Sequence, residues 1–139
     1  TSIEEFMGQN TARYVLNPEP HLDPEATENI DLMEFVNHFT HETDEMNGLY
    51  DVVRKVHRTI RAGSGDCVDY SAVACSWLLQ HTNTHPRIIV YAPIDTNPGH
   101  INVYGNGQIY DYKGTYNTTP EEFASSLDSL SLAYKTEPI

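Results

Sequence analysis

Apolar residues recur three and four positions apart through the first half of the chain, which is the spacing of one face of an α-helix. The pattern predicts helices over residues 2–16, 29–43 and 44–60, the last of them ending at Gly63. Three prolines within residues 17–26 favour an extended connector between the first two helices. The N-terminal part is therefore predicted to be helical.

A longer helical pattern follows the segment GSGDC, residues 63–67. Its middle consists of small residues, including Ser71 and Ala72, which would let the helix approach a sheet closely. Asp69 and other polar residues are expected on the opposite side of this helix. We expect the helix, which begins at Cys67, to lie at the centre of the molecule.

The period changes in the second half of the chain, where short β-branched and aromatic runs replace the helical spacing. Residues 87–94 predict a buried strand, and residues 100–112 predict two strands joined by an Asn-Gly turn, a strong hairpin signal. Residues 118–135 predict a final helix with Thr119 as its N-cap. This order indicates an α+β fold in which the central cysteine-bearing helix packs against a small antiparallel sheet.

The 139 residues are expected to form a single domain, with an N-terminal helical part (1–49), a core (50–113) and a C-terminal helix and tail (114–139). Hydrophobic residues make up 39% of the chain and aromatic residues 10%, which is typical of globular proteins. No apolar run approaches the ~20 residues that span a bilayer, and the first residues lack the features of a secretion signal. Neither membrane association nor export is expected.

The charge is strongly negative, with 20 acidic residues against 8 basic ones and a net charge of −12. Nucleic-acid binding relies on clustered Lys and Arg, so nucleic acid is not an expected partner. The acidity is interpreted as a contribution to solubility, with a high-salt habitat or the steering of a cationic substrate as alternatives.

Cys67 and Cys75 are the two cysteines of the chain. On one helix they would lie about 12 Å apart, beyond the ~7 Å between Cα atoms that a disulfide tolerates. Two unpaired thiols favour a reducing compartment, and a cytoplasmic location is therefore expected.

Cys67 stands where Ser, Thr, Asn or Asp normally caps a helix. The free N–H groups and partial positive charge of a helix start are expected to lower the pKa of its thiol. The backbone N–H of Cys67 is also a candidate donor to a developing oxyanion. The alternative is an ordinary core residue, the interpretation preferred for Cys75, because cysteine is among the most frequently buried residue types.

A nucleophilic thiol needs a base, and the base needs a group that orients it. With a two-residue turn in the predicted hairpin, Asn102 faces Asp111 and His100 faces Lys113. Alternation then places His100, Asn102 and Asp111 on one face, with His100 and Asp111 as diagonal neighbours whose Cα atoms lie about 7–8 Å apart. The chain therefore predicts a triad of Cys67, His100 and Asp111.

The segments GSGDCVDYSAVACSWLL, RIIVYA and GHINVYGNGQIYDY resemble the core of the transglutaminase-like superfamily, a branch of the papain-like cysteine enzymes. That family has a Gly-x-Cys at the start of a central helix, an arginine-bearing strand, and a histidine and an aspartate on successive strands. The resemblance covers about residues 50–113 and matches Gly65, Cys67, Arg87, His100 and Asp111 in order. It implies the same thiol chemistry at these positions.

The expected function is hydrolysis of a peptide, isopeptide or other amide bond through a thioester acyl-enzyme on Cys67, with a protein or peptide as substrate and no cofactor. Transfer of the acyl group to an amine and a non-catalytic binding module on the same scaffold are the alternatives. Asn102, Gly65 and Asp66 are assigned to substrate binding or orientation.

A cluster of His38, His41, Glu42 and Asp44 offers potential metal ligands, with the two histidines three positions apart on a predicted helix. No strong metal-binding motif accompanies them, and an exposed polar face is the preferred interpretation. No metal site is predicted.

Overall fold

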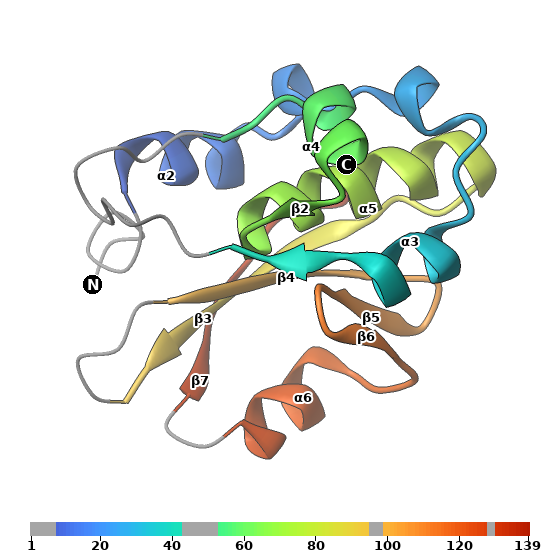
Figure 1. The fold of residues 1–139 in the computed structure, drawn as a ribbon. Helices are drawn as coiled ribbons and strands as arrows, with labels where there is room; N and C mark the ends of the chain where they lie inside the picture. Colours follow the sequence, from blue (N-terminus) through green and yellow to red (C-terminus); the bar gives the residue numbers. More distant parts are fainter. Residues whose placement is uncertain (1–7, 43–52, 95–98, 128–129) are drawn as a thin grey trace.

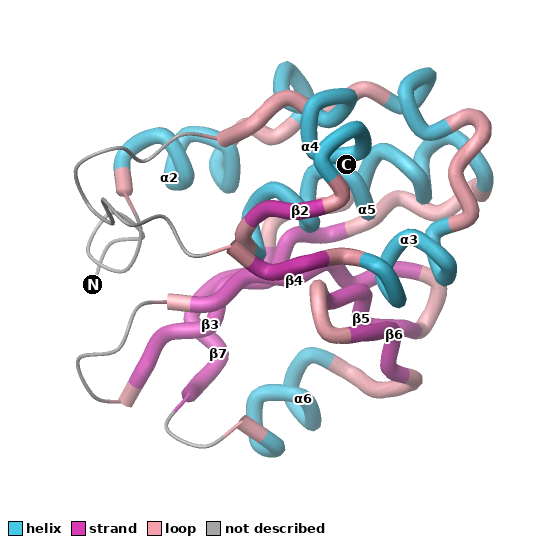
Figure 2. Tube along the Cα trace, viewed as in Figure 1, coloured by secondary structure: helices cyan, strands magenta, loops and turns pink. Residues whose placement is uncertain are grey.

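The computed structural model describes residues 8–42, 53–94, 99–127 and 130–139. It has an α+β fold in which an antiparallel sheet has most of the helices on one side and the C-terminal helix on the other (Figures 1 and 2). The helices are α2 (Gln9–Leu16), α3 (Leu32–His38), α4 (Val56–Ala62), α5 (Cys67–His81) and α6 (Pro120–Ser126). The α+β prediction, with a cysteine on the central helix, is confirmed.

The sheet has five strands in the order β6-β5-β4-β3-β7. Their bounds are β3 (Arg87–Pro93), β4 (His100–Gly105), β5 (Gln108–Asp111), β6 (Gly114–Tyr116) and β7 (Leu130–Lys135). Apolar side chains alternate between the two faces, since the strand period is two. One face packs under α5 and the other under α6 (Figure 1).

The core on the α5 side is the larger of the two, and α5 itself is buried along most of its length. Asp69 and Ser76, on the side of the helix opposite its apolar face, are buried as well. The sheet contributes Ile88, Val90, Ile101, Val103 and Tyr110 to this core. Full burial of one such side chain stabilises the fold by about 1.5–3 kcal/mol.

The β4–β5 hairpin has the predicted two-residue turn, in which Asn106 has a φ of 54° and Gly107 a φ of 73°. Both residues are left-handed, as a turn that matches the twist of the strands requires. The predicted pairing of Lys113 with His100 is wrong. The chain turns a second time after Asp111, which pairs with Gly114 of β6.

The N-terminal third is less helical than predicted. The expected extended connector contains two short 3₁₀ turns, Glu19–His21 and Pro24–Thr27. The helix expected over residues 29–43 ends at His38, and Thr40–His41 form a strand, β1, that pairs in parallel with β2 (Ser64–Gly65). The backbone carbonyls of Gly63 and Gly65 accept hydrogen bonds from backbone N–H groups of residues 40–42. These sheet hydrogen bonds replace the helical ones that were expected there.

The three predicted N-terminal helices fall partly outside the described residues. The undescribed part contains residues 2–7 of the first, residue 43 of the second and residues 44–52 of the third. The end of the third helix is as predicted, since Gly63 is the left-handed C-cap of α4 with a φ of 63°.

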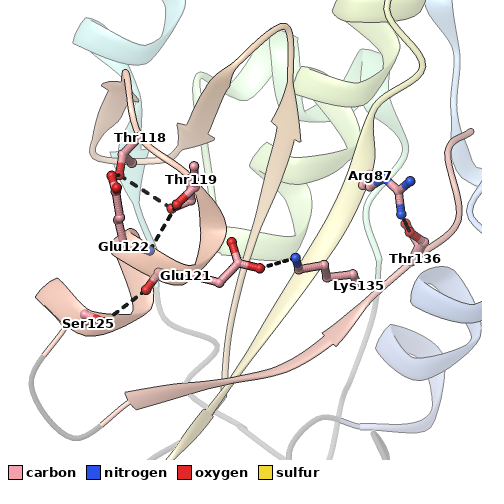
Figure 3. A network of polar contacts seen from close by, with 8 residues as sticks. All are labelled: Arg87, Thr118, Thr119, Glu121, Glu122, Ser125, Lys135 and Thr136. Atoms are coloured by element: carbon pink, nitrogen blue, oxygen red, sulfur yellow. Dashed lines mark hydrogen bonds and ion pairs between the residues drawn. The ribbon is translucent and has the colours of Figure 1, made fainter.

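The C-terminal helix predicted over residues 118–135 is wrong in its second half. Thr119 caps α6 as expected, accepting from the backbone N–H of Glu122 at 3.2 Å, but the chain then returns as β7 alongside β3 (Figure 3). A side-chain contact between Lys135 of β7 and Glu121 of α6 ties the two together (Figure 3). The alternation of leucine and serine in LSLAYK was the local signal of a strand.

Candidate active site

His100 and Asp111 form a short hydrogen bond at the ends of β4 and β5. The distance from Nε2 of His100 to Oδ1 of Asp111 is 2.7 Å. The carboxylate can only accept here, so Nε2 carries the proton and Nδ1 is the ring nitrogen left to accept one. The side chain of Asp111 is 2% exposed and that of His100 is 16% exposed, so water has little access to the bond.

The His100 ring lies between two tyrosines. Its centroid is 5.9 Å from that of Tyr91 and 5.7 Å from that of Tyr112. Tyr91 belongs to the core on the α6 side of the sheet, whereas Tyr112 packs against the core on the α5 side. The histidine therefore lies at the end of the strands, where the two sides of the sheet meet.

Cys67 is the first residue of α5, but it is not the cap. Asp66 is the N-cap, and its carboxylate accepts from the backbone N–H of Asp69 at 2.9 Å. The prediction that the cysteine occupies the capping position is therefore wrong by one residue. An aspartate meets the unpaired N–H groups of the helix start better than a thiol does.

The sulfur of Cys67 lies beside β4. The backbone N–H of Ile101, the residue after His100, acts on the thiol and favours its ionised form, and Asp111 is also close enough to act on it. The side chain of Cys67 is half-buried at this junction. The start of α5 and the end of the hairpin thus lie close together.

The pKa of Cys67 differs from the expectation. Burial, and then the neighbouring Asp66 carboxylate, raise the pKa of this thiol to about 12. Asp111 and Asp69 act in the same direction, and the N–H of Ile101 only partly opposes them. Desolvation therefore outweighs the field of the helix start, and the thiol is the resting form of Cys67.

The turn before Cys67 is held by a buried carboxylate that sequence patterns did not single out as part of the site. Asp69 accepts from the backbone N–H of Asp66 at 3.1 Å and from that of Arg54 at 3.0 Å. A Cβ atom on Gly65 would come within 2.7 Å of the Asp69 carboxylate, so glycine is needed there. The spacing of two aspartates three residues apart, which predicts a capping box, was the available signal.

Asn102 lies inside the sheet rather than in an open cleft. It is 1% exposed, and its side-chain oxygen accepts from the hydroxyl of Tyr91 at 3.2 Å. Because the Tyr91 ring packs against His100, the structure links Asn102 to the histidine through Tyr91. Asp66 is half-buried beside Cys67, and burial followed by the Asp69 charge raises the pKa of its carboxyl to about 6.

Arg87, which matches the arginine of the resemblance, lies at the other end of β3 from the partner of His100. Its guanidinium donates to the backbone carbonyl of Thr136 at 3.3 Å (Figure 3). This contact fastens the segment after β7 to β3 and is remote from Cys67 along the sheet.

The histidines of the candidate metal cluster separate in the fold. His38 is in α3 and donates to the backbone carbonyl of Glu34 at 3.0 Å, whereas His41 is in β1 and stacks on Tyr112 at 4.4 Å between ring centroids. Asp44 lies outside the described residues. Within the described ranges, no group of three or more His, Cys, Asp or Glu residues is arranged to hold a metal.

Comparison with known proteins identifies the fold. No family model matches the sequence, and no curated protein matches it significantly. The chain is similar in structure to LapG of Legionella pneumophila in its calcium-bound form, with a TM-score of 0.56 and 19% identity over 91% of this chain and 72% of that one. The EGTA-treated form gives a TM-score of 0.55 over 91% and 70% of the two chains.

The similarity to LapG is one of fold. In this chain the α+β core carries a cysteine on its central helix. None of the helices in the described ranges combines the length and apolar character needed to cross a membrane.

Proposed function

We propose that this protein is a cysteine hydrolase that cleaves a peptide, isopeptide or other amide bond with Cys67, His100 and Asp111. The observation that carries the proposal is the 2.7 Å hydrogen bond between His100 and Asp111. The interaction of the Cys67 thiol with the backbone N–H of Ile101, the residue after His100, supports it. The sequence resemblance to the transglutaminase-like superfamily and the structural similarity to LapG support it.

The first half of the reaction forms the acyl-enzyme. The thiol proton of Cys67 moves to Nδ1 of His100, and the sulfur attacks the carbonyl carbon of the substrate. The carbon–nitrogen bond then breaks, and the leaving amine takes the proton from Nδ1. Because burial makes an isolated thiolate unfavourable, the transfer must leave the positive charge on the adjacent imidazole, and Asp111 stabilises that charge.

The second half releases the product. Water attacks the thioester carbon, gives one proton to Nδ1 of His100, and the carbon–sulfur bond breaks. The proton returns to the sulfur, and the acyl group leaves as a carboxylic acid. The backbone N–H of Cys67, at the free start of α5, is the oxyanion donor assigned to both halves.

The proposal is tested by incubating the protein with a mixed peptide library and identifying new peptide ends by mass spectrometry. We expect cleavage by the natural chain and none by the Cys67→Ala or His100→Ala variants. Repeating the incubation with a primary amine, such as glycine ethyl ester, separates hydrolysis from acyl transfer, since only a transferase incorporates the amine. Identical peptide profiles for the natural chain and Cys67→Ala would argue against the enzyme.

A non-catalytic binding module is the second candidate, and the raised pKa of Cys67 favours it. In that case the thiol is a packing residue at the helix start, and the hydrogen bond of His100 stabilises the hairpin. Such a module would show no reactivity of Cys67 that depends on His100.

A further inference from the structure

A chain of aromatic rings connects the candidate acid–base pair to a separate segment of the protein. Tyr112 meets the His100 ring edge to face, with an interplanar angle of 67°, and His41 stacks on Tyr112 with an angle of 23°. In the sequence, His41 stands out only as a potential metal ligand. In the structure the ring of Tyr112 connects the ring of His41 to that of His100.

Tyr112 lies beside all three members of the proposed triad. It contacts His100 directly, and both Asp111 and Cys67 are close enough to raise the pKa of its hydroxyl, after the main effect of burial. It occupies the turn between β5 and β6, where the backbone N–H of Lys113 approaches Oδ2 of Asp111 at 3.4 Å. Its ring therefore covers the end of the hairpin at which the His100–Asp111 bond lies.

His41, in β1, covers a face of Tyr112. β1 is fastened to the segment before Cys67, because Thr40 donates to the carbonyl of Gly63 at 3.0 Å and Glu42 donates to that of Gly65 at 2.8 Å. The stack of His41 on Tyr112 consequently joins the segment that leads to the nucleophile with the hairpin that carries the base.

We propose that Tyr112 is a positioning residue that shields the His100–Asp111 hydrogen bond from water, and that His41 holds Tyr112 in place. A hydrogen bond to a carboxylate is stronger where water is excluded, because the local dielectric is lower and no water competes. The proposed base keeps its proton on Nε2, and thereby Nδ1 as its accepting nitrogen, only while this bond is intact. The inference rests on the proposed function for its catalytic meaning, but the shielding itself is a property of the hairpin.

The test follows the proton on Nε2 of His100 by ¹H NMR, measuring its rate of exchange with water. We expect Tyr112→Ala and His41→Ala to speed exchange about tenfold or more, as removal of a shielding ring opens the bond to solvent. Tyr112→Phe and His41→Phe retain the rings and should exchange at the natural rate. Tyr134→Ala and His57→Ala, which remove exposed rings elsewhere, are the matched controls.

An exchange rate that stays within about twofold of the natural one in both alanine variants would overturn the inference. If Tyr112→Ala fails to fold by circular dichroism, the exposed His41 position carries the test, because its side chain is not part of the core. The measurement does not require Cys67 to react. A protein whose exchange responds as expected, but whose Cys67 shows no His100-dependent reactivity, would refute the proposed function and leave the shielding role in place.

Discussion

The two cysteines of α5 illustrate how two similar thiols acquire different surroundings. Burial raises the pKa of each to about 12. Cys75 is fully buried in mid-helix near Ser71 and the hydroxyl of Tyr14, which lies 4.0 Å from its sulfur. Cys67 is only half-buried, and carboxylates and the end of a histidine-bearing strand surround it.

The difference between the two thiols lies in what can receive a proton. The hydroxyls near Cys75 are poor bases, and burial raises the pKa of Tyr14 well above its ordinary value. Next to the strand that approaches Cys67, His100 is bonded to a carboxylate that would stabilise a charged imidazole, so in the proposed triad this ring receives the proton. A buried thiol becomes a nucleophile through such a neighbour, and the following substitutions test that distinction.

The largest effect is expected from Asp111→Asn. The asparagine amide can donate to Nε2 of His100, which would move the ring proton to Nδ1 and leave no acceptor for the thiol proton. We expect the alkylation rate of Cys67 by iodoacetamide to fall about 100-fold, in the range of a lost general base. An unchanged rate at Cys67 would show that the orientation of His100 does not matter.

The next largest effect is expected from Gly65→Ala, because the new Cβ would meet the Asp69 carboxylate at 2.7 Å. Overpacking of this kind costs about 1–3 kcal/mol, to be measured as the free energy of unfolding in urea. The distortion lies beside Cys67, so its alkylation should slow as well. Gly107→Ala is a useful control: the Cβ at that position meets no atom within 4 Å, although its φ of 73° is also left-handed.

Tyr14→Phe should lower the stability of the protein through the surroundings of Cys75 and leave those of Cys67 unchanged. The hydroxyl of Tyr14 is 2.8 Å from that of Ser71 in the buried interface between α2 and α5. Loss of this bond is expected to cost about 1 kcal/mol in the free energy of unfolding. The alkylation rate of Cys67 should be unchanged, and a parallel loss at Cys67 would contradict the separation of the two environments.

Asp66→Asn is expected to have the smallest effect. Asparagine preserves the cap and removes the charge that helps raise the pKa of Cys67, so the pH profile of alkylation should shift to lower pH. Asp66 itself has a raised pKa of about 6 against an ordinary value of 3.8. The folded protein therefore holds this proton more tightly, and its contribution to stability is present below about pH 4 and lost as pH rises through 6.

The comparison of Asp66→Asn with the natural chain isolates that pH dependence. Their difference in free energy of unfolding should change between pH 4 and pH 6 and remain constant above it. A constant difference across the whole range would mean that Asp66 titrates at its ordinary pKa.

Local sequence signals predicted the part of the site that lies in one hairpin. The Asn-Gly turn determines the register of β4 and β5, and the register places His100 diagonal to Asp111. The long run of small and apolar residues likewise identified α5. These features depend on residues close together in the chain, where strand alternation and turn chemistry are sufficient.

Long-range contacts produced the features that the sequence did not predict. β1 depends on carbonyls at Gly63 and Gly65, and β7 depends on pairing with β3, although its residues include good helix formers. The approach of His41 to Tyr112 follows from β1 and has no local signal. The pKa of Cys67 was misjudged because the degree of burial at the helix start cannot be read from helical position.

The most direct test of the central claim is alkylation of Cys67 by iodoacetamide at pH 6 in a Cys75→Ala background, with and without His100→Ala. Removing Cys75 leaves Cys67 as the single thiol, so all labelling can be assigned to it. We expect measurable labelling that falls about 100-fold when the imidazole is removed. Equally slow labelling of both proteins would contradict it, because the thiol would then have no base.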